Sequence, residues 1–332
     1  MALIGSLNSG ISALRNFSRG LEVIGNNIAN VNSTAFKGSR TKYTDSFSQF
    51  LRQPSTSPAD GNGSNAAASQ VGLGVQIAGV QTSFLQGGLT TTGQSTDLAI
   101  SGAGFFQVQD ARNGRLYATR AGDFRTDDRG YLTTNDGYRL QGLTGGYVTY
   151  DATVVNGQLE YSPTFVAASG VGDMQIDFNP TYDGTTLGRL TNNTGGAFTD
   201  QEVYLSAPRM VSFAFNPNGD LNVRFTNGDE FVAGRVLLMD FRDPTALVRE
   251  GANLFSGFEA AGIIGTANMT VADNTPGSYG LGEIRGGTLE LSNVDLTEEF
   301  ANMITTQRSF QAGSRIITVS DDILQEVVNL KR

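Results

Sequence analysis

Residues 1–31 read MALIGSLNSGISALRNFSRGLEVIGNNIANV. Apolar side chains recur at every seventh position, and a second apolar row accompanies them: Leu7, Leu14, Leu21 and Ile28, then Ile11, Phe17, Ile24 and Val31. Residues three, four and seven positions apart share one face of an α-helix. The sequence therefore predicts an amphipathic helix over roughly residues 3–31.

The C-terminal residues 296–332 repeat this pattern. Their apolar side chains form a seven-residue row with a wider stripe beside it: Leu296, Met303, Phe310, Ile317 and Leu324, then Phe300, Ile304, Val327 and Val328. An amphipathic helix cannot bury its apolar stripe alone, so we expect the two end helices to pack on each other or on neighbouring copies of the chain. The residues between them then form an insertion.

Two features favour neighbouring copies as partners. The first helix contains Gly10, Gly20 and Gly25, each of which costs about 1 kcal/mol relative to alanine, so its order is expected to depend on partners. The stretch 54–70 is rich in Ser, Pro, Gly, Asn and Ala, which is typical of a mobile linker. Such a linker would separate the helix from the middle of the chain, and a bundle formed among many subunits accommodates this arrangement.

The composition disfavours several functional classes. The 23 basic and 32 acidic residues give a formal net charge of −9, whereas nucleic-acid binding requires clustered Lys and Arg. The chain has no Cys and no His, so disulfides and the commonest general base and metal ligand are missing. Residues 1–10 contain no basic region, and no apolar run approaches the ~18 residues of a membrane helix. We expect no nucleic-acid partner, no membrane insertion and no cleaved signal peptide.

The middle of the chain is expected to be built from strands. After Val71, short apolar runs alternate with turn sequences such as Asn216–Gly219 and Asn227-Gly228. The fold class predicted is mainly β with terminal α-helices that pair as a coiled-coil-like domain, and a discontinuous β domain with a second β domain inserted. The predicted boundaries are 1–35 with 290–332 for the helical domain, 36–70 for a linker or hinge, 71–146 with 208–289 for the β domain, and 147–207 for the inserted outer β domain.

Local patterns refine this prediction. Weak strands are expected in the insert, including one at 203–205, and helices only near the chain ends. Asp295 with Glu298 resembles a helix N-cap and its reciprocal partner. Lys37, Arg40 and Lys42 form a small basic group, predicted to be a solvated or intersubunit charged face rather than an anion site.

No catalytic, cofactor or metal site is predicted. The glycine pairs at 72–74 and 102–104 do not continue as phosphate-binding motifs, so turns or bulges are favoured. Asp123, Asp127 and Asp128 lack the oxygen spacing and closing Glu of a calcium loop, which favours a hairpin turn. A carboxylate glycosidase would need two acids facing a cleft, and no pair can be nominated. A secreted adhesin could share the Gly- and Asn-rich β composition, but it would not need the two apolar repeats.

Three motifs carry a resemblance to a known family. Residues 25–38 read GNNIANVNSTAFKG, residues 97–108 read DLAISGAGFFQV, and the C-terminal part contains SNVDL at 292–296 and NMITTQRSFQ at 302–311. These resemble, in the same order, the N-terminal, central and C-terminal signatures of the bacterial flagellar rod and hook proteins.

The resemblance implies a structural, non-enzymatic subunit of the flagellar hook, with a distal rod protein as the close alternative. A β insert at 147–207 and the sequence LGEIRGGTLE at 281–290 resemble hook proteins, whereas the short insert and LRQP at 51–54 resemble distal rod proteins. The family implies a homopolymer at the bacterial flagellum, with terminal helices as an inner tube and β domains as outer shells. Its further partners would be the rod, the hook–filament junction proteins, the hook cap and the export apparatus.

The residues expected to carry self-assembly are the apolar positions of the two end helices: Leu7, Leu14, Phe17, Leu21, Ile24, Ile28, Leu296, Phe300, Met303, Phe310, Ile317 and Leu324. No cofactor is expected.

Overall fold

The computed structural model describes residues 2–54, 67–156, 158–179, 181–182, 187–195, 197–265 and 269–330. The chain divides into two compact units. The first holds residues 1–32, 37–85 and 293–332, and the second holds residues 33–36 and 86–292. Residues 55–66 of the predicted linker lie outside the described residues. No described helix is long and apolar enough to cross a membrane.

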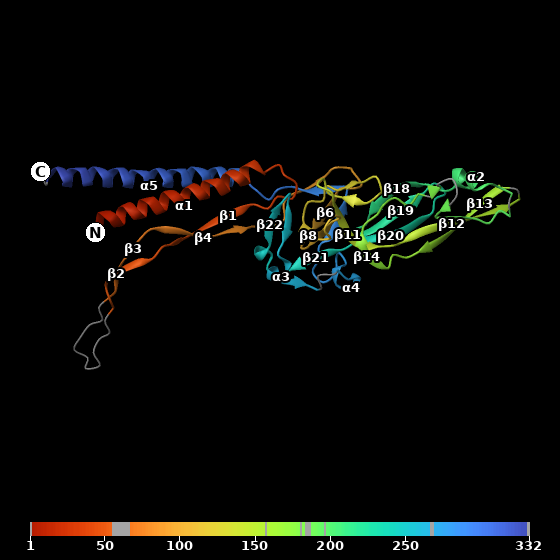
Figure 1. Ribbon diagram of the computed structural model, residues 1–332, viewed down its shortest axis with the longest axis horizontal. Coiled ribbons are helices and arrows are strands. Elements are labelled where there is room, and N and C mark those ends of the chain that lie inside the picture. The colour runs from red at the N-terminus through yellow and green to blue at the C-terminus, as the bar shows by residue number, and fades with distance from the viewer. Residues whose placement is uncertain are drawn as a thin grey trace, which may run out of the picture. The chain divides into compact units, whose positions relative to one another are not determined.

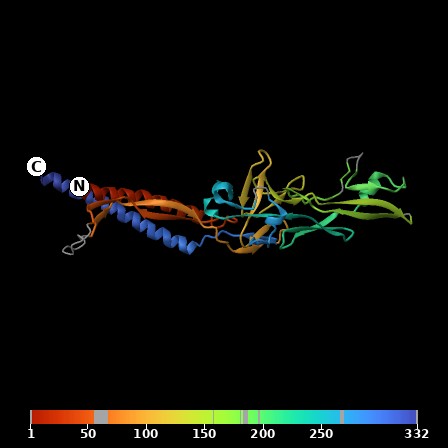
Figure 2. The same ribbon diagram turned by 90° about the horizontal axis from the view of Figure 1, so that it is seen from below.

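Two long helices dominate the first unit. They are α1 (Ala2–Ala29) and α5 (Leu296–Leu330), close to the predicted spans. Ser6 meets Ser320 at one end of the pair, where their hydroxyl oxygens are 3.2 Å apart, and Asn27 meets Glu299 at the other. The helices are therefore antiparallel, and both lie side by side in Figures 1 and 2 with the two termini at the same end. This pairing within one chain is the simpler of the two arrangements considered from the sequence.

Helix α5 begins at a side-chain cap. Asp295 Oδ1 accepts hydrogen bonds from the backbone N–H groups of Thr297, at 2.7 Å, and Glu298, at 3.4 Å. These bonds satisfy donors that have no partner within the helix. The carboxylate of Glu298 accepts instead from Arg40 at 2.6 Å, so the predicted N-cap is confirmed and Glu298 has a different partner.

The first unit also contains four strands, where the sequence predicted a linker up to residue 70. They are β1 (Ser39–Asp45), β2 (Ser48–Arg52), β3 (Ser69–Gly72) and β4 (Val75–Thr82). Strand β1 pairs with β4 and β2 pairs with β3, both antiparallel. The strands after residue 69 thus belong to a ribbon beside the helices, and the predicted boundary at residue 71 falls inside it.

The second unit is mainly β. Its largest sheet has 13 strands among the described residues, in the main order β18-β19-β20-β11-β7-β8-β23-β22. The bounds of its strands are β5 (Leu89–Thr91), β6 (Leu98–Ser101), β7 (Phe105–Asp110), β8 (Leu116–Thr119), β9 (Arg125–Thr126), β10 (Leu132–Thr133), β11 (Tyr138–Thr144), β12 (Tyr147–Val155), β13 (Gln158–Val166), β14 (Gly170–Asp173), β15 (Thr181–Tyr182), β16 (Leu187–Gly188), β17 (Leu190–Asn192), β18 (Met210–Phe215), β19 (Asp220–Phe225), β20 (Glu230–Val236), β21 (Leu238–Phe241), β22 (Val248–Gly251), β23 (Leu254–Ser256), β24 (Ile263–Ile264), β25 (Glu283–Gly286) and β26 (Thr288–Glu290).

Short helices interrupt these strands, where the sequence predicted helices only near the chain ends. They are α2 (Asp200–Ser206), η1 (Pro244–Ala246), α3 (Phe258–Ala261) and α4 (Val271–Asn274). The weak strand predicted at 203–205 is wrong, because these residues belong to α2. Thr199 accepts from the backbone of Glu202, whose side chain accepts from the backbone of Thr199. This reciprocal cap fixes a helix start at that point.

The predicted insert, residues 147–207, lies within the second unit and does not form a compact unit of its own. It forms a sheet of its own in which β12 pairs with β13 and β17. Its apolar side chains Val148, Tyr150 and Leu190 nevertheless belong to the same hydrophobic core as Leu98 and Phe106. The insert therefore extends the β unit and shares its core.

The chain enters and leaves the β unit through paired strands. Strand β5 pairs with β26, and β6 pairs with β25, both antiparallel. The first and last strands of the unit are thus hydrogen-bonded to each other, and the segments that lead to β4 and to α5 start from neighbouring strands.

Candidate assembly interface

Small residues form the contact between α1 and α5. A Cβ atom added to Gly10 would lie 2.9 Å from Ile317 Cγ1 and 3.4 Å from the carbonyl oxygen of Gly313. A Cβ on Gly313 would lie 3.4 Å from Cβ of Ala13. The helix backbones approach closely here, so a side chain at position 10 would force Ile317 to shift. Gly10 thus contributes packing within the chain, in contrast to its predicted role as a source of disorder.

The other side of α1 packs on the β ribbon. A Cβ on Gly20 would overlap the hydroxyl of Tyr43 on β1. The Tyr43 ring also packs edge-on against Phe17, with ring centroids 5.5 Å apart. Helix α1 is therefore held between α5 and the β1–β4 ribbon.

The line of α5 that faces α1 is polar or small. Its residues recur every seventh position: Glu299, Thr306, Gly313 and Ser320. Of the apolar row predicted from the sequence, Ile317 contacts α1 at Gly10, whereas Leu296 and Leu324 are exposed. Packing within the chain therefore leaves the apolar row of α5 partly uncovered.

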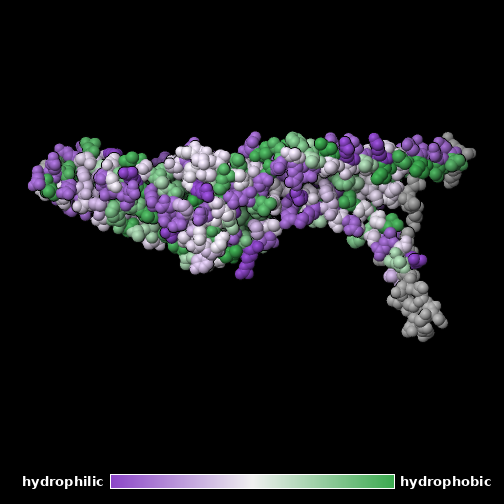
Figure 3. All heavy atoms as spheres, turned by 180° about the vertical axis from the view of Figure 1, so that it is seen from behind, coloured by the Kyte–Doolittle hydropathy of each residue, from purple (hydrophilic) through white to green (hydrophobic). Residues whose placement is uncertain are grey.

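All twelve predicted assembly residues lie in the described part of the chain, and none of them is buried. Phe300 is 50% exposed, and Leu296 and Leu324 are also exposed; the other nine are partly buried. A further exposed apolar row, absent from the predicted set, lies on the C-terminal half of α5: Ile316, Val319, Ile323, Val327 and Leu330. Figure 3 shows apolar side chains gathered along this end of the helical unit. Contiguous exposed apolar surface of this kind marks an interaction site.

Asn27 fixes the end of α1 by hydrogen bonds from its buried side chain. Its Nδ2 donates to the carbonyl oxygen of Ser39 at 2.7 Å and to Glu299 Oε1 at 3.1 Å, and its Oδ1 accepts from the backbone N–H of Ser39 at 3.0 Å. One side chain thus joins α1, β1 and the first turn of α5.

Asn293 and Lys37 form a second connection nearby. Asn293 accepts from the N–H of Gly38 at 2.8 Å and donates to the carbonyl oxygens of Ser83 and Leu85. Lys37 Nζ, which is buried, donates to the same Leu85 oxygen at 2.9 Å. We call Asn27, Lys37 and Asn293 the polar clasp. The prediction of a solvated basic face is therefore wrong for Lys37, whereas Arg40 and Lys42 are exposed.

The polar clasp was not among the predicted site residues, although all three side chains stand in or beside the quoted family motifs. An Asn or Lys in a polar stretch carries no signal of burial. Among the described residues, no cluster of three or more acidic side chains could hold a metal ion.

The clasp should make the helix pair sensitive to pH through Glu299. Burial raises the pKa of this carboxyl above its ordinary value of 4.5; the hydrogen bond from Asn27 lowers it and Glu298 raises it. A carboxyl whose pKa is raised in the folded state destabilises that state once it is ionised. The free energy of unfolding is therefore expected to fall as pH rises above about 4.5. Glu299→Gln is therefore expected to raise the melting temperature of the helical signal at pH 7 and to leave it unchanged at pH 3, as measured by circular dichroism.

Glu326→Gln, at an exposed position of the same helix, is the matched control and should change neither melting temperature. An equal gain for Glu299→Gln at both pH values would contradict this assignment, because the ionised carboxylate is absent at the lower pH.

Three family models match this chain. "Flagella basal body rod protein" matches residues 7–37, "Flagellar hook protein FlgE/F/G D1 domain" matches residues 99–179, and "Flagellar basal body rod FlgEFG protein C-terminal" matches residues 285–330. The first and last cover α1 and α5, including the polar clasp. The helix that carries the exposed apolar row, α5, and its partner α1 are therefore the parts described by these rod models.

Curated relatives cover the chain almost completely. The flagellar basal-body rod protein FlgG of Bacillus subtilis is 34% identical over 330 positions, which span 99% of this chain and all of that protein. The flagellar basal-body rod protein FlgG of Borreliella burgdorferi is 29% identical over 94% of this chain and 93% of its own length. The flagellar hook protein FlgE of the same organism is 28% identical over 453 positions, covering 99% of this chain and all of that protein.

Proposed function

Because the chain belongs to the family of bacterial flagellar rod and hook proteins, we propose that it is the structural subunit of the flagellar hook, a tubular polymer that transmits torque as a flexible joint. Members of this family are structural proteins that form polymers within the flagellar axis. The observation that supports a polymer subunit here is the uncovered apolar surface of α5, together with the exposed Ile11 of α1.

The physical basis of assembly is burial of these rows between copies. Burying one Leu or Phe side chain contributes about 1.5–3 kcal/mol. Different surfaces of the two helices carry apolar residues, so one copy can contact the next through unlike patches. Unlike contacts that do not close into a ring generate a helical polymer. The twelve predicted residues are proposed to lie in these contacts.

The extra sheet of residues 147–207 supports the hook over the rod. Its strands β12, β13 and β17 form a separate sheet, and β14 of the same segment pairs with β11 of the largest sheet. Its exposed large apolar side chains stand singly in the sequence, at Tyr147, Val155, Phe165, Val171 and Leu205. A surface without contiguous apolar runs suits a unit that slides against its neighbours while the polymer bends. The proposed partners are the rod on one side and the junction proteins on the other, with the hook cap and export apparatus acting during assembly.

A distal rod protein is the second candidate, and the alignments favour it. The FlgG relative of B. subtilis aligns over 330 positions, close to the 332 residues of this chain. The FlgE relative of B. burgdorferi needs 453 positions, so that alignment contains long gaps in this chain. On this reading, the polymer is a straight shaft of the basal body.

Electron microscopy of isolated flagella, with gold-labelled antibody against this chain, separates the two candidates. The hook proposal predicts label on the curved segment between basal body and filament. Label confined to the straight shaft of the basal body would overturn the hook proposal in favour of the rod proposal. Label on neither structure would contradict both proposals. An antibody against the filament serves as a positional control.

A further inference from the structure

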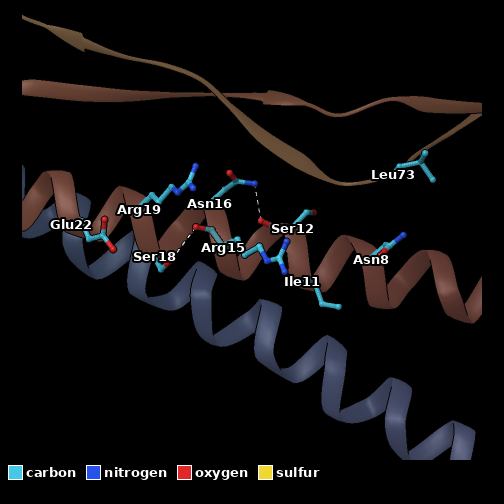
Figure 4. A pocket seen from close by; sticks show the side chains of 9 residues that line it. All are labelled: Asn8, Ile11, Ser12, Arg15, Asn16, Ser18, Arg19, Glu22 and Leu73. Atoms are coloured by element: carbon cyan, nitrogen blue, oxygen red, sulfur yellow. Dashed lines mark hydrogen bonds between the residues drawn. The ribbon is translucent and has the colours of Figure 1, made fainter.

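A groove runs along the face of α1 that is turned away from α5. It has a volume of about 740 Å³, and its lining includes Ile11, Arg15, Arg19 and Glu22 of α1 and Leu73 of the β3–β4 turn. Figure 4 shows Arg15, Arg19 and Glu22 along α1, with Leu73 on the turn beside the helix. The groove therefore presents two cations and one carboxylate, a net positive charge, with Ile11 and Leu73 as its apolar side chains.

The walls of this groove are held by specific contacts. Asn16 Nδ2 donates to the carbonyl oxygen of Val75 at 2.6 Å, and Ser12 Oγ accepts from the N–H of Val75 at 3.3 Å. Gly74 has a φ of +130°, and a Cβ there would overlap Ser12 Oγ. The β3–β4 turn is thus seated directly on α1, and the groove exists in the free chain.

The cations of the groove have no acidic partner in the described part of the chain. Arg15 and Arg19 are exposed and lie four residues apart, on one face of the helix. Neither forms an ion pair among the described residues. Ile11 is 40% exposed beside them. The groove is therefore suited to an acidic, apolar segment.

The C-terminal half of α5 has this character. Between residues 316 and 330 every charged side chain is acidic: Asp321, Asp322 and Glu326. The same segment carries the exposed apolar row that includes Ile323 and Val327. Residues 8–22 of the groove wall and residues 316–330 are equally long, each about 22 Å at 1.5 Å per residue. Charge, apolarity and length therefore match the groove.

We infer that the groove receives the C-terminal half of α5 from a second copy of this chain, with Arg15 and Arg19 facing its acidic side chains. The α5 of the same chain cannot fill the groove, because it packs on the opposite face of α1 through Gly10 and Ala13. Groove and segment are different surfaces, so each copy offers both, and the contact propagates head to tail. This inference rests on the proposed polymer and names the contact that orders it.

Charge reversal in the full-length protein tests this contact. Arg15→Glu/Arg19→Glu and Asp321→Lys/Asp322→Lys should each raise the critical concentration for polymerisation about tenfold at low salt, since opposed charges become like charges. The four substitutions combined should restore assembly, because the attraction is re-formed with its sign exchanged. Arg112→Glu/Arg129→Glu, at exposed positions of the β unit, reverses the same number of charges and should assemble normally.

The outcomes separate this contact from the polymer itself. Sedimentation and electron microscopy measure assembly, and circular dichroism confirms that each variant is folded. Wild-type polymers together with normal assembly of Arg15→Glu/Arg19→Glu would overturn the groove contact and leave the proposed function standing. Loss of assembly in both reversed pairs without restoration in the combined variant would also overturn it. A wild-type chain that forms no polymer would overturn the proposed function and the contact with it.

Discussion

Phe310→Asp is expected to abolish polymerisation and to leave the β unit folded. Phe310 lies on α5 beside the line that faces α1 and is only partly buried in the chain. In a polymer the substitution removes about 1.5–3 kcal/mol of apolar burial, roughly a 10- to 150-fold change in affinity per contact. It also forces a carboxylate into an apolar interface, which adds a larger desolvation penalty. Sedimentation of the assembled protein measures the loss.

The β unit provides the internal control for this substitution. Its hydrophobic core runs from Leu98 to Ile284 and includes no residue of α1 or α5. The β signal in circular dichroism should therefore be unchanged. Phe310→Leu keeps an apolar side chain and should still polymerise. Normal polymers of Phe310→Asp would show that this apolar row has no part in assembly.

The end helices could be predicted from the sequence because their signal is local. A seven-residue apolar period and an Asp at the N-cap need only neighbouring residues, and the predicted spans agree closely with α1 and α5. The facing line between the helices could not be predicted in this way. It is built on Gly10, Gly313 and Ser320, where close backbone approach selects small residues, and a search for apolar periodicity passes over them.

The β unit shows the same division between local and distant interactions. The predicted turns at Asn216–Gly219 and Asn227-Gly228 do connect β18 to β19 and β19 to β20, because turn chemistry is local. The pairing of β5 with β26 joins residues about 200 positions apart, and no local pattern specifies it. The shared core of residues 147–207 likewise depends on contacts across the fold.

The polar clasp illustrates why burial of polar groups escapes a sequence pattern. Lys37 is 1% exposed, although lysine is almost never buried without partners. Its burial depends on the carbonyl oxygen of Leu85, which is placed there by the chain 48 residues later. Helix α2 is different, because its start does have a local signal in the sequence. Thr199 and Glu202 have the spacing of a capping box.

Arg120→Met is expected to destabilise the β unit by about 3–5 kcal/mol, because it removes the guanidinium that pairs with a buried carboxylate. Arg120 and Glu290 are both buried, with Nη1 and Oε2 3.5 Å apart. Arg120 Nη2 also donates to the carbonyl oxygen of Gly102 at 2.9 Å, and Glu290 Oε1 accepts from the N–H of Gly87 at 2.8 Å. Burial lowers the pKa of the Arg120 guanidinium, and Glu290 opposes that shift. Urea unfolding followed by circular dichroism measures the change.

The double variant Arg120→Met/Glu290→Gln distinguishes the lost charge pair from lost packing. Gln keeps an oxygen that can accept from Gly87 and removes the buried charge, so the double variant should unfold at a higher urea concentration than Arg120→Met alone. Since Glu290 lies on β26, the strand that pairs with β5, the single variant should weaken the place where the chain enters and leaves the β unit. Equal destabilisation of the single and double variants would mean that the methionine disturbs packing around Phe105, whose ring centroid lies 5.2 Å from the guanidinium carbon, and that the ion pair contributes little.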